Sequence, residues 1–294
     1  MWKPKASEFD IVSDLLCATD GSRILTMAYP GPNESLITSP LLRRGGRLVL
    51  DTVFPRLCPA CDVTLEKHAP RSGIDAWLCQ VCLGDLEPIK PPYCSVCGES
   101  FDGPMTREFR CSNCDGRRMA FDFAISAFKA RGVLRELIHQ FKYSRDLSLR
   151  GVLADTLKPA LNDPRLIGED LSQWLLVPVP LHFLREMRRE FNQSWELCRM
   201  LAEETGIPAV QALRRTRLTS TQAKLQRRQR LENLRGVFAL RLALPWRPRP
   251  DLLGRKILLV DDVLTTGATA HECAKVLKRQ AGAEKVVVIT AARG

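Results

Sequence analysis

The sequence predicts an α/β protein with an open, mostly parallel sheet, preceded by a small cysteine-rich module. Short, continuous apolar runs such as 257–260 and 286–289 are typical of strands that are buried on both faces of a parallel sheet. Segments with helical spacing of apolar residues lie between such runs, as expected for an α/β fold. Four Cys-x-x-Cys pairs stand ahead of them, between residues 58 and 114.

Length and charge bound the possible functions. The chain has 294 residues, enough for one sizeable domain and a smaller one. Its net charge of +11 favours polyanionic partners, such as nucleic acid, phosphate-rich ligands or an anionic surface, without choosing among them. No apolar run approaches the ~20 residues of a membrane-spanning helix, and the amino terminus lacks the pattern of a signal peptide. We therefore expect a soluble, cytoplasmic protein.

Composition divides the chain into three parts. Residues 1–44 are punctuated by glycine and proline and are expected to form a poorly ordered extension, with Met27 as an alternative start. Residues 45–119 hold the cysteine pairs and are expected to form a double zinc ribbon. Residues 120–294 hold the strand and helix patterns. Cys17 stands alone in the extension, where a free thiol is its expected state.

The cysteine pairs predict two tetrahedral zinc sites. Each Cys-x-x-Cys can place two thiolates on one side of a metal, and two such pairs complete a site. Joining the first pair to the second and the third to the fourth keeps the loops 62–78 and 98–110 at lengths typical of zinc ribbons. Disulfides would need an oxidising compartment, and a redox role does not explain four pairs in a row. The predicted ligands of two structural Zn²⁺ ions are Cys58, Cys61, Cys79, Cys82, Cys94, Cys97, Cys111 and Cys114.

The sheet domain is expected to open with a strand and two helices. Residues 121–128 alternate between apolar and polar side chains and predict a strand, which ends before Gly132. Helical spacing follows over 134–141 and again over 149–157. Lys142, at the end of the first helix, is expected to be solvated, with phosphate binding as the alternative.

A second strand is predicted over 174–180, and a basic segment follows it. Basic side chains after the carboxyl end of a parallel strand point into the ligand crevice of an open α/β sheet. A solvated basic turn is also compatible with the charge of this chain. A helix is expected to open at 191–193 and to run to Thr205, where Gly206 ends it. The basic residues of the segment are His182, Arg185, Arg188 and Arg189.

The most basic stretch of the chain spans residues 214–235. A mobile arm of this charge could close over a phosphorylated ligand or lie along a nucleic-acid backbone, whereas a solvated helical face is the simpler alternative. A strand is expected over 238–244, followed by a stiff proline-rich connector over 245–250. Candidate nucleic-acid contacts in this stretch are Arg227, Arg228 and Arg230.

Residues 256–270 combine a buried strand, an acidic pair and a glycine–threonine turn. The strand leads into Asp261 and Asp262, then into the turn 265–269 and an amphipathic helix. Backbone N–H groups at the start of a helix lie at its positive end, and Gly267 lets the backbone approach a phosphate. The two carboxylates stand where acceptors for vicinal sugar hydroxyls are needed. This turn is therefore predicted to hold a ribose 5-phosphate.

This segment resembles the phosphoribosyl pyrophosphate (PRPP) motif of type I phosphoribosyltransferases, in which an apolar run leads into Asp-Asp, two residues and Thr-Thr-Gly-x-Thr. The alternative is an ordinary strand–turn–helix whose threonines only cap the helix. The resemblance implies a sheet of the type I phosphoribosyltransferase kind and Mg²⁺ that accompanies PRPP. The PRPP residues that it implies are Asp261, Asp262, Thr265, Thr266, Gly267, Ala268, Thr269, Arg185 and Arg189, with Asp261 and Asp262 as the catalytic pair.

The ordered set of motifs resembles the competence protein F family. Double zinc knuckles precede the PRPP motif, and between them lie the family-like segments 177–182, 191–193 and 217–222. The resemblance covers about residues 45–294 and implies a role in natural transformation, in which single-stranded DNA is handled in the cytoplasm with a competence helicase as a further partner. Glu190 departs from the family, which usually has Arg-Gly-Phe-Asn-Gln here. An acid adds repulsion against pyrophosphate and removes backbone freedom.

Two functions of different classes remain open. A PRPP-binding protein would hold a phosphorylated ligand in the turn, while its basic surface and zinc module engage DNA or partners. An active phosphoribosyltransferase would move phosphoribose from PRPP to a nitrogen base in nucleotide metabolism. Its oxocarbenium-like centre would need placed charge rather than a nucleophile. No stretch of the sequence is identified as a purine or pyrimidine pocket, so the binding function is favoured.

Overall fold

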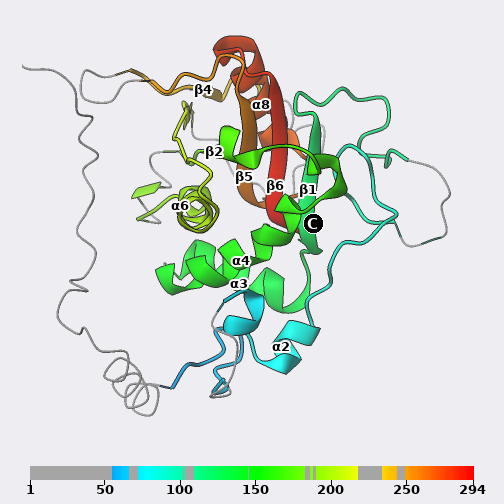
Figure 1. Cartoon of the computed structure of the whole chain (residues 1–294), viewed down its shortest axis with the longest axis vertical. Coiled ribbons are helices and arrows are strands. Elements are labelled where there is room, and N and C mark those ends of the chain that lie inside the picture. The colour runs from blue at the N-terminus through cyan, green and yellow to red at the C-terminus, as the bar shows by residue number, and fades with distance from the viewer. Residues whose placement is uncertain are drawn as a thin grey trace, which may run out of the picture. The chain divides into compact units, whose positions relative to one another are not determined.

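A central sheet of four strands organises the structure, a computed structural model of the whole chain (Figure 1). The strands are β1 (Phe123–Lys129), β2 (Leu175–Pro178), β5 (Lys256–Leu264) and β6 (Lys285–Arg293). They lie in the order β1-β6-β5-β2, and each neighbouring pair is parallel. The predicted open parallel sheet is confirmed.

The structure describes residues 55–65, 72–101, 103, 109–144, 146–182, 186–187, 190–217, 234–243 and 249–294. These residues belong to one compact unit, Asp51–Gly294. Several predicted features lie outside the described residues, namely the extension 1–44, Arg185, Arg188, Arg189, Arg227, Arg228 and Arg230.

Helices cover both faces of the sheet. Figure 1 shows α3, α4, α6 and α8 around the sheet. Successive side chains of a strand point to opposite faces, so Leu258 and Val260 pack with α3, α4 and α6, whereas Ile257 and Leu259 pack with α8. Among the described residues, no helix has the length and apolar character needed to cross a membrane. The helices are α2 (Gln80–Gly84), α3 (Gly132–Tyr143), α4 (Arg150–Leu161), α6 (Gln193–Thr205) and α8 (Ala268–Ala281), with 3₁₀ turns at Ile74–Ala76, Leu147–Leu149, Pro164–Leu166 and Leu171–Gln173.

The helix α6 has the ends that the sequence predicts. The Asn192 side chain caps it by accepting a hydrogen bond from Ser194 N at 3.1 Å. Gly206 ends it with a φ of 74°, in the left-handed region that glycine adopts without a steric penalty. The predicted strands over 121–128 and 174–180 also correspond to β1 and β2, with their bounds moved by a few residues.

A separate antiparallel ribbon lies beside the sheet. The strand β3 (Leu213–Arg215) pairs with β4 (Phe238–Leu240), and β4 packs against α8. The sequence predicts a longer strand over 238–244, and the pairing with β3 was not predicted. Because two short strands of this kind are held by contacts between distant residues, neither shows a strong local pattern.

The cysteine-rich module is joined to the sheet through backbone hydrogen bonds on the outer side of β1. Ile89 N donates to Ala127 O at 2.9 Å, and Lys129 N donates to Glu87 O at 2.8 Å. Nearer the start of the strand, Ala124 N donates to Val96 O at 2.8 Å. The chain between the first and second metal sites therefore runs along β1.

The module also contacts the helices. Trp77 Nε1 donates to Asp155 Oδ2 at 2.7 Å, and the Trp77 ring lies so close to Gly151 that a Cβ there would approach it within 2.4 Å. Gly151 thus permits close packing of Trp77 on α4. Asp85 Oδ2 accepts a hydrogen bond from Val133 N at 2.6 Å, which satisfies one of the free N–H groups at the start of α3.

Candidate functional site

The carboxyl ends of the parallel strands bring the candidate residues to one edge of the sheet. Asp261 is in register with Thr290 of β6, and Val260 is in register with Pro178 of β2. In an open α/β sheet, ligands bind in the crevice outside this edge. The acidic pair, the turn after β5 and the segment after β2 therefore all face the same region.

The phosphate turn, defined here as residues 265–269, joins β5 to α8 as the sequence predicts. Gly267 has φ 71° and ψ 5°, a left-handed conformation, and it precedes the first helical residue. A Cβ at Gly267 would lie 3.6 Å from the Phe121 ring and 3.8 Å from Met119, which are ordinary contact distances. The backbone conformation, rather than lack of space, therefore requires glycine here.

The start of α8 presents polar groups suited to an anion. Ala268 N donates only a long hydrogen bond, of 3.4 Å, to Thr266 Oγ1. The first turn of α8 has no acidic side chain, and Thr265 is exposed while Thr266 and Thr269 are half-buried. Backbone N–H groups at the positive end of a 14-residue helix, together with threonine hydroxyls, can hold a phosphate group.

The two carboxyl groups at the end of β5 have different partners. Asp262 is only 6% exposed and forms an ion pair with Lys142 of α3, with 3.0 Å between Nζ and Oδ1. Asp261 Oδ1 accepts hydrogen bonds from Ser194 Oγ of α6 and from Asp262 N, both at 3.0 Å. Lys142, expected from the sequence to be solvated, is instead a partner of the acidic pair.

Burial makes the carboxyl group of Asp261 a weaker acid than usual. Desolvation raises the pKa of its carboxyl group to about 7, and repulsion by Asp262 adds to this, while Lys142 and Ser194 act in the opposite direction. Near neutral pH this carboxyl group can therefore both donate and accept a hydrogen bond, depending on its protonation state.

Cys198 and Cys273 are fully buried, and burial holds the pKa of each thiol well above its ordinary value. Neither thiol is therefore a ready metal ligand.

The eight predicted cysteine ligands form two clusters. Within each cluster the four Sγ atoms lie within 4.8 Å of one another, and the clusters pair the first knuckle with the second and the third with the fourth, as predicted. The Cys61–Cys79 and Cys97–Cys111 sulfur separations are 3.6 and 3.5 Å. A tetrahedral Zn²⁺ with ~2.3 Å bonds needs sulfurs about 3.8 Å apart, so both clusters fit structural zinc.

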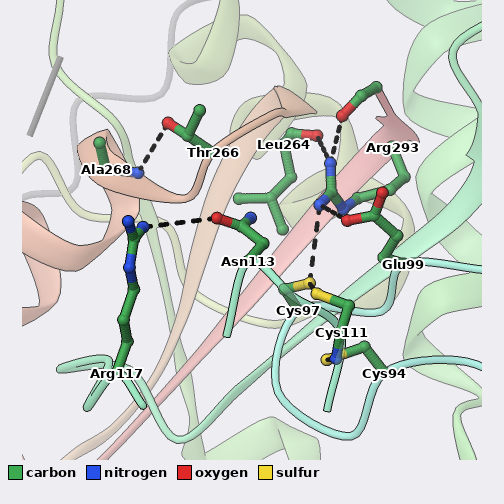
Figure 2. A network of polar contacts seen from close by, with 11 residues as sticks. Cys94, Cys97, Glu99, Cys111, Asn113, Arg117, Leu264, Thr266, Ala268 and Arg293 are labelled. Carbon is green, nitrogen blue, oxygen red and sulfur yellow. Dashed lines mark hydrogen bonds and ion pairs between the residues drawn. The ribbon is translucent and has the colours of Figure 1, made fainter. Parts of the chain in front are cut away.

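The second cluster is connected to the phosphate turn by a buried arginine (Figure 2). Arg293 of β6 is 6% exposed, and its Nη1 donates to Leu264 O, at the end of β5, at 3.0 Å. Its Nη2 donates to Cys97 Sγ at 3.6 Å and to Glu99 Oε2 at 2.5 Å. No sequence pattern pointed to Arg293, because its partners Cys97 and Glu99 lie far away along the chain.

A small basic cleft of about 250 Å³ lies against the first turns of α8. Arg117, Arg118 and Arg235 line it together with His271 and Glu272. Burial lowers the pKa of His271, whose Nδ1 accepts a hydrogen bond from Ala120 N at 3.0 Å. The histidine is therefore neutral at physiological pH, and the arginines supply the positive charge of this cleft.

A larger cleft of about 400 Å³ lies beside the carboxyl end of β2. Pro178 and Asn192 line one part of it, and Arg214, Arg215 and Arg241 line another. The sequence pointed to basic side chains at this edge. In the described part of the chain, these come from the β3–β4 ribbon and the residue after it rather than from the segment that directly follows β2.

The backbone at Glu190 adopts a conformation that is typical of glycine. Its φ is 68°, in the left-handed region, and its side chain is exposed. This is the position at which the resemblance to the competence protein F family leads us to expect glycine. The loop thus keeps a glycine-like backbone at a strain of roughly 1–2 kcal/mol while presenting a negative charge.

Comparison with known proteins identifies relatives over most of the chain. A family profile described as a double zinc ribbon domain matches residues 49–115. Competence protein F of Haemophilus influenzae is 30% identical over 227 residues, which cover 77% of this chain and 93% of that protein. The DNA utilization protein YhgH of Escherichia coli K12 is 33% identical over 233 residues, covering 78% and 93%. Competence protein ComFC of Bacillus subtilis is 25% identical over 249 residues, covering 81% and 95%.

Solved phosphoribosyl proteins resemble the chain more distantly. The hypoxanthine-guanine phosphoribosyl transferase of L. donovani has a TM-score of 0.25 and 18% identity, over 46% of this chain and 65% of that one. The phosphoribosylpyrophosphate synthetase of Mycobacterium smegmatis has a TM-score of 0.24 and 17% identity, over 42% of this chain and 29% of that one.

Metal content tests the two cysteine clusters. Protein purified under reducing conditions should contain two zinc ions per chain, because each cluster offers four thiolates in a tetrahedral arrangement. Cys58→Ser and Cys111→Ser should each remove one ion in elemental analysis. Cys17→Ser, Cys198→Ser and Cys273→Ser are the controls and should retain both. A parent protein with less than one zinc per chain would contradict the assignment.

The pH dependence of stability tests the state of Asp261. Its folded-state pKa of about 7 is above the ordinary carboxyl value near 4, so its contribution to stability is complete below about pH 4 and is lost as the pH rises through 7. Asp261→Asn removes this titration. The free energy of unfolding in urea should therefore fall less from about pH 5 to pH 8 in the variant than in the parent.

The exposed Asp115 provides a control for this measurement. Asp115→Asn should leave the pH dependence of the parent unchanged. Identical pH profiles for the parent and Asp261→Asn would mean that burial does not hold a proton on Asp261.

Proposed function

The chain belongs to the competence protein F family, and from this premise we propose that it binds PRPP or a related ribose phosphate at the carboxyl end of β5 and handles single-stranded DNA. The names of its relatives support a role in competence or in DNA utilization. The observation that carries the ligand proposal is the phosphate turn, which is separated from Asp262 by two residues, follows the end of β5 and opens α8.

Each part of the site has a distinct role in this proposal. The 5-phosphate lies against residues 265–269, where the N–H groups of the first helical turn and the threonine hydroxyls donate to it. Asp261 accepts from a ribose hydroxyl, because one of its oxygens already accepts from Ser194 while the other has no such bond among the described contacts. Asp262 holds Lys142, and through it α3, at the edge of the site.

Mg²⁺ enters the proposal only as a companion of PRPP. Proteins usually hold Mg²⁺ with one or two carboxylates plus the phosphates of the substrate. Asp261 is the carboxyl group available for this purpose, because Asp262 is paired with Lys142. An ion there would favour the charged form of Asp261 and so lower its pKa.

An active phosphoribosyltransferase is the second candidate function. The cleft of about 400 Å³ beside β2 supports it, since this volume lies within the range of small-molecule sites. Glu190 weakens it, because an exposed acid after β2 repels pyrophosphate. Pyrophosphate release from PRPP, measured with and without candidate bases, separates this enzyme from a binding protein.

Substitution of Gly267 tests the ligand site. Gly267→Ala adds a side chain where φ is 71°, so the turn must change its backbone conformation. Affinity for ribose 5-phosphate or PRPP should fall by about 1.5–3 kcal/mol, the contribution of a hydrogen bond to a charged group. Isothermal titration calorimetry measures the change. Replacing both Asp261 and Asp262 with alanine should also weaken binding, through loss of the hydroxyl acceptors.

Gly254→Ala is the matched control for backbone strain. Gly254 has φ 64° and open space around its Cβ position, and it lies before β5, away from the phosphate turn. This variant should lose stability as Gly267→Ala does but keep the affinity of the parent. If both variants bind with parental affinity, the ligand site lies elsewhere.

Salt dependence tests the handling of DNA. Single-stranded DNA should bind with little sequence preference, and log Kobs should fall with log salt by about 0.7 per phosphate contact. Changing Arg227, Arg228 and Arg230 together to glutamine should flatten this slope without altering zinc content or PRPP binding. The assay is fluorescence anisotropy with a labelled oligonucleotide over a series of salt concentrations.

A second triple variant separates local contacts from net charge. Arg135, Arg255 and Arg279 are exposed on other parts of the surface, and their replacement with glutamine removes the same charge. That variant should keep the parental slope. If the Arg227, Arg228 and Arg230 variant binds DNA like the parent, the contact lies elsewhere, with Arg107, Arg110, Arg117 and Arg118 of the zinc module as the next candidates.

A further inference from the structure

The buried guanidinium of Arg293 joins two parts of the molecule that have separate roles. One nitrogen donates to the carbonyl of Leu264, the residue directly before the phosphate turn, at 3.0 Å. The other donates to the sulfur of Cys97 at 3.6 Å and to the carboxylate of Glu99 at 2.5 Å (Figure 2). A single planar group therefore spans the second cysteine cluster and the end of β5.

Charge explains why an arginine is stable in this buried position. A zinc ion with four thiolate ligands retains a net charge of about −2. A guanidinium that donates to one of the ligand sulfurs offsets part of that charge and is itself compensated. Removal of the metal would leave the four sulfurs without the ion that fixes their positions, so the contact between Arg293 and Cys97 would no longer be held in place.

The chain that follows the second cysteine cluster contacts the start of α8 as well. Met119 and Phe121, which follow the last cysteine of the second cluster, lie 3.8 and 3.6 Å from the position of a Cβ on Gly267. Ala120 N donates to the ring of His271 in the first turns of α8 at 3.0 Å. Groups near the second metal site thus form hydrogen bonds with Leu264, just before the phosphate turn, and with His271, just after it.

The first metal site has different neighbours. Its part of the chain contacts α4 through Trp77 and Asp155, and α3 through Asp85 and Val133. Among the described residues, no hydrogen bond connects the first metal site, formed by Cys58, Cys61, Cys79 and Cys82, with the phosphate turn. The first metal site can therefore serve as an internal control for the second, which lies near the turn.

We propose that Arg293 is a positioning residue that couples metal retention in the second site, formed by Cys94, Cys97, Cys111 and Cys114, to anion binding in the phosphate turn. With metal bound, Arg293 holds the carbonyl of Leu264 and the turn keeps the shape that accepts a phosphate. Because coupling between two sites is reciprocal, the bound phosphate also strengthens retention of this metal and leaves the first metal unaffected. The identity of the anion rests on the proposed function, whereas the contact between metal site and turn does not.

Hydrogen exchange measures the coupling without any ligand. Loss of the second metal in Cys111→Ser should increase amide exchange over residues 265–271 about tenfold or more. Loss of the first metal in Cys58→Ser should leave these amides as in the parent. Equal exchange in the two variants, whether raised or unchanged, would overturn the proposal.

Metal release measures the coupling in the other direction. The intact protein is challenged with a chromogenic chelator, with and without saturating ribose 5-phosphate. The ligand should slow the release of one of the two metals by roughly fivefold or more. Arg293→Lys keeps the charge but cannot span both partners, so it should weaken the second site about 10- to 100-fold and abolish the protection by ligand.

Arg165→Lys is the matched control for a merely structural role. Arg165 is half-buried, and like Arg293 it joins the chain around the second cysteine cluster to the sheet domain, since its Nη1 donates to Ser95 O at 3.1 Å. Among its described hydrogen bonds, none reaches the phosphate turn. This variant should keep ligand protection of one metal. Loss of protection in Arg165→Lys, or protection of both metals in the parent, would contradict a specific role for Arg293.

The two proposals fail in different ways. If ribose 5-phosphate does not bind the parent protein in calorimetry, the proposed ligand is wrong, and the exchange of residues 265–271 in the two cysteine variants still decides the coupling. If the ligand binds but protects neither metal, the ligand assignment stands and the coupling is wrong.

Discussion

Placing a half-buried and a buried carboxyl group side by side, as Asp261 and Asp262 are near the end of β5, is costly unless each has a compensating partner. Asp262 has Lys142 of α3, and Asp261 has Ser194 of α6 and the backbone N–H of its neighbour. Two helices on one face of the sheet therefore each direct a polar group to the same edge. Lys142 and Ser194 both lower the pKa of Asp261, against the desolvation that raises it.

Local patterns in the sequence predicted the parts of the fold that are encoded within a few residues. The buried run of β5, the glycine–threonine turn before the helix and the Cys-x-x-Cys spacing each reflect local geometry, and the structure confirms the strand, the start of the helix after the turn and the two clusters. Pairs that join distant residues were not predicted, such as β3 with β4 and Arg293 with Cys97. A residue type also does not reveal its backbone angle, so the left-handed conformation of Glu190 was seen only in the structure.

The two metal sites have different relations to the rest of the molecule. The first contacts helices, where Trp77 lies against Gly151 and reaches Asp155. The second lies against the ends of β5 and β6 through Arg293. The module has little apolar sequence of its own, so much of its folding free energy must come from metal binding. The two metal sites therefore support contacts with the sheet domain at different places, the first at the helices and the second at the ends of β5 and β6.

The strand β1 pairs with β6 on one side. The chain between the two metal sites covers its other, outer side. Without that cover, β1 would be an edge strand of seven residues with unpaired backbone groups and a mostly apolar sequence. Such an edge is a template for pairing with a second copy of the same chain. The segment between the metal sites therefore protects the edge of the sheet in addition to joining the two clusters.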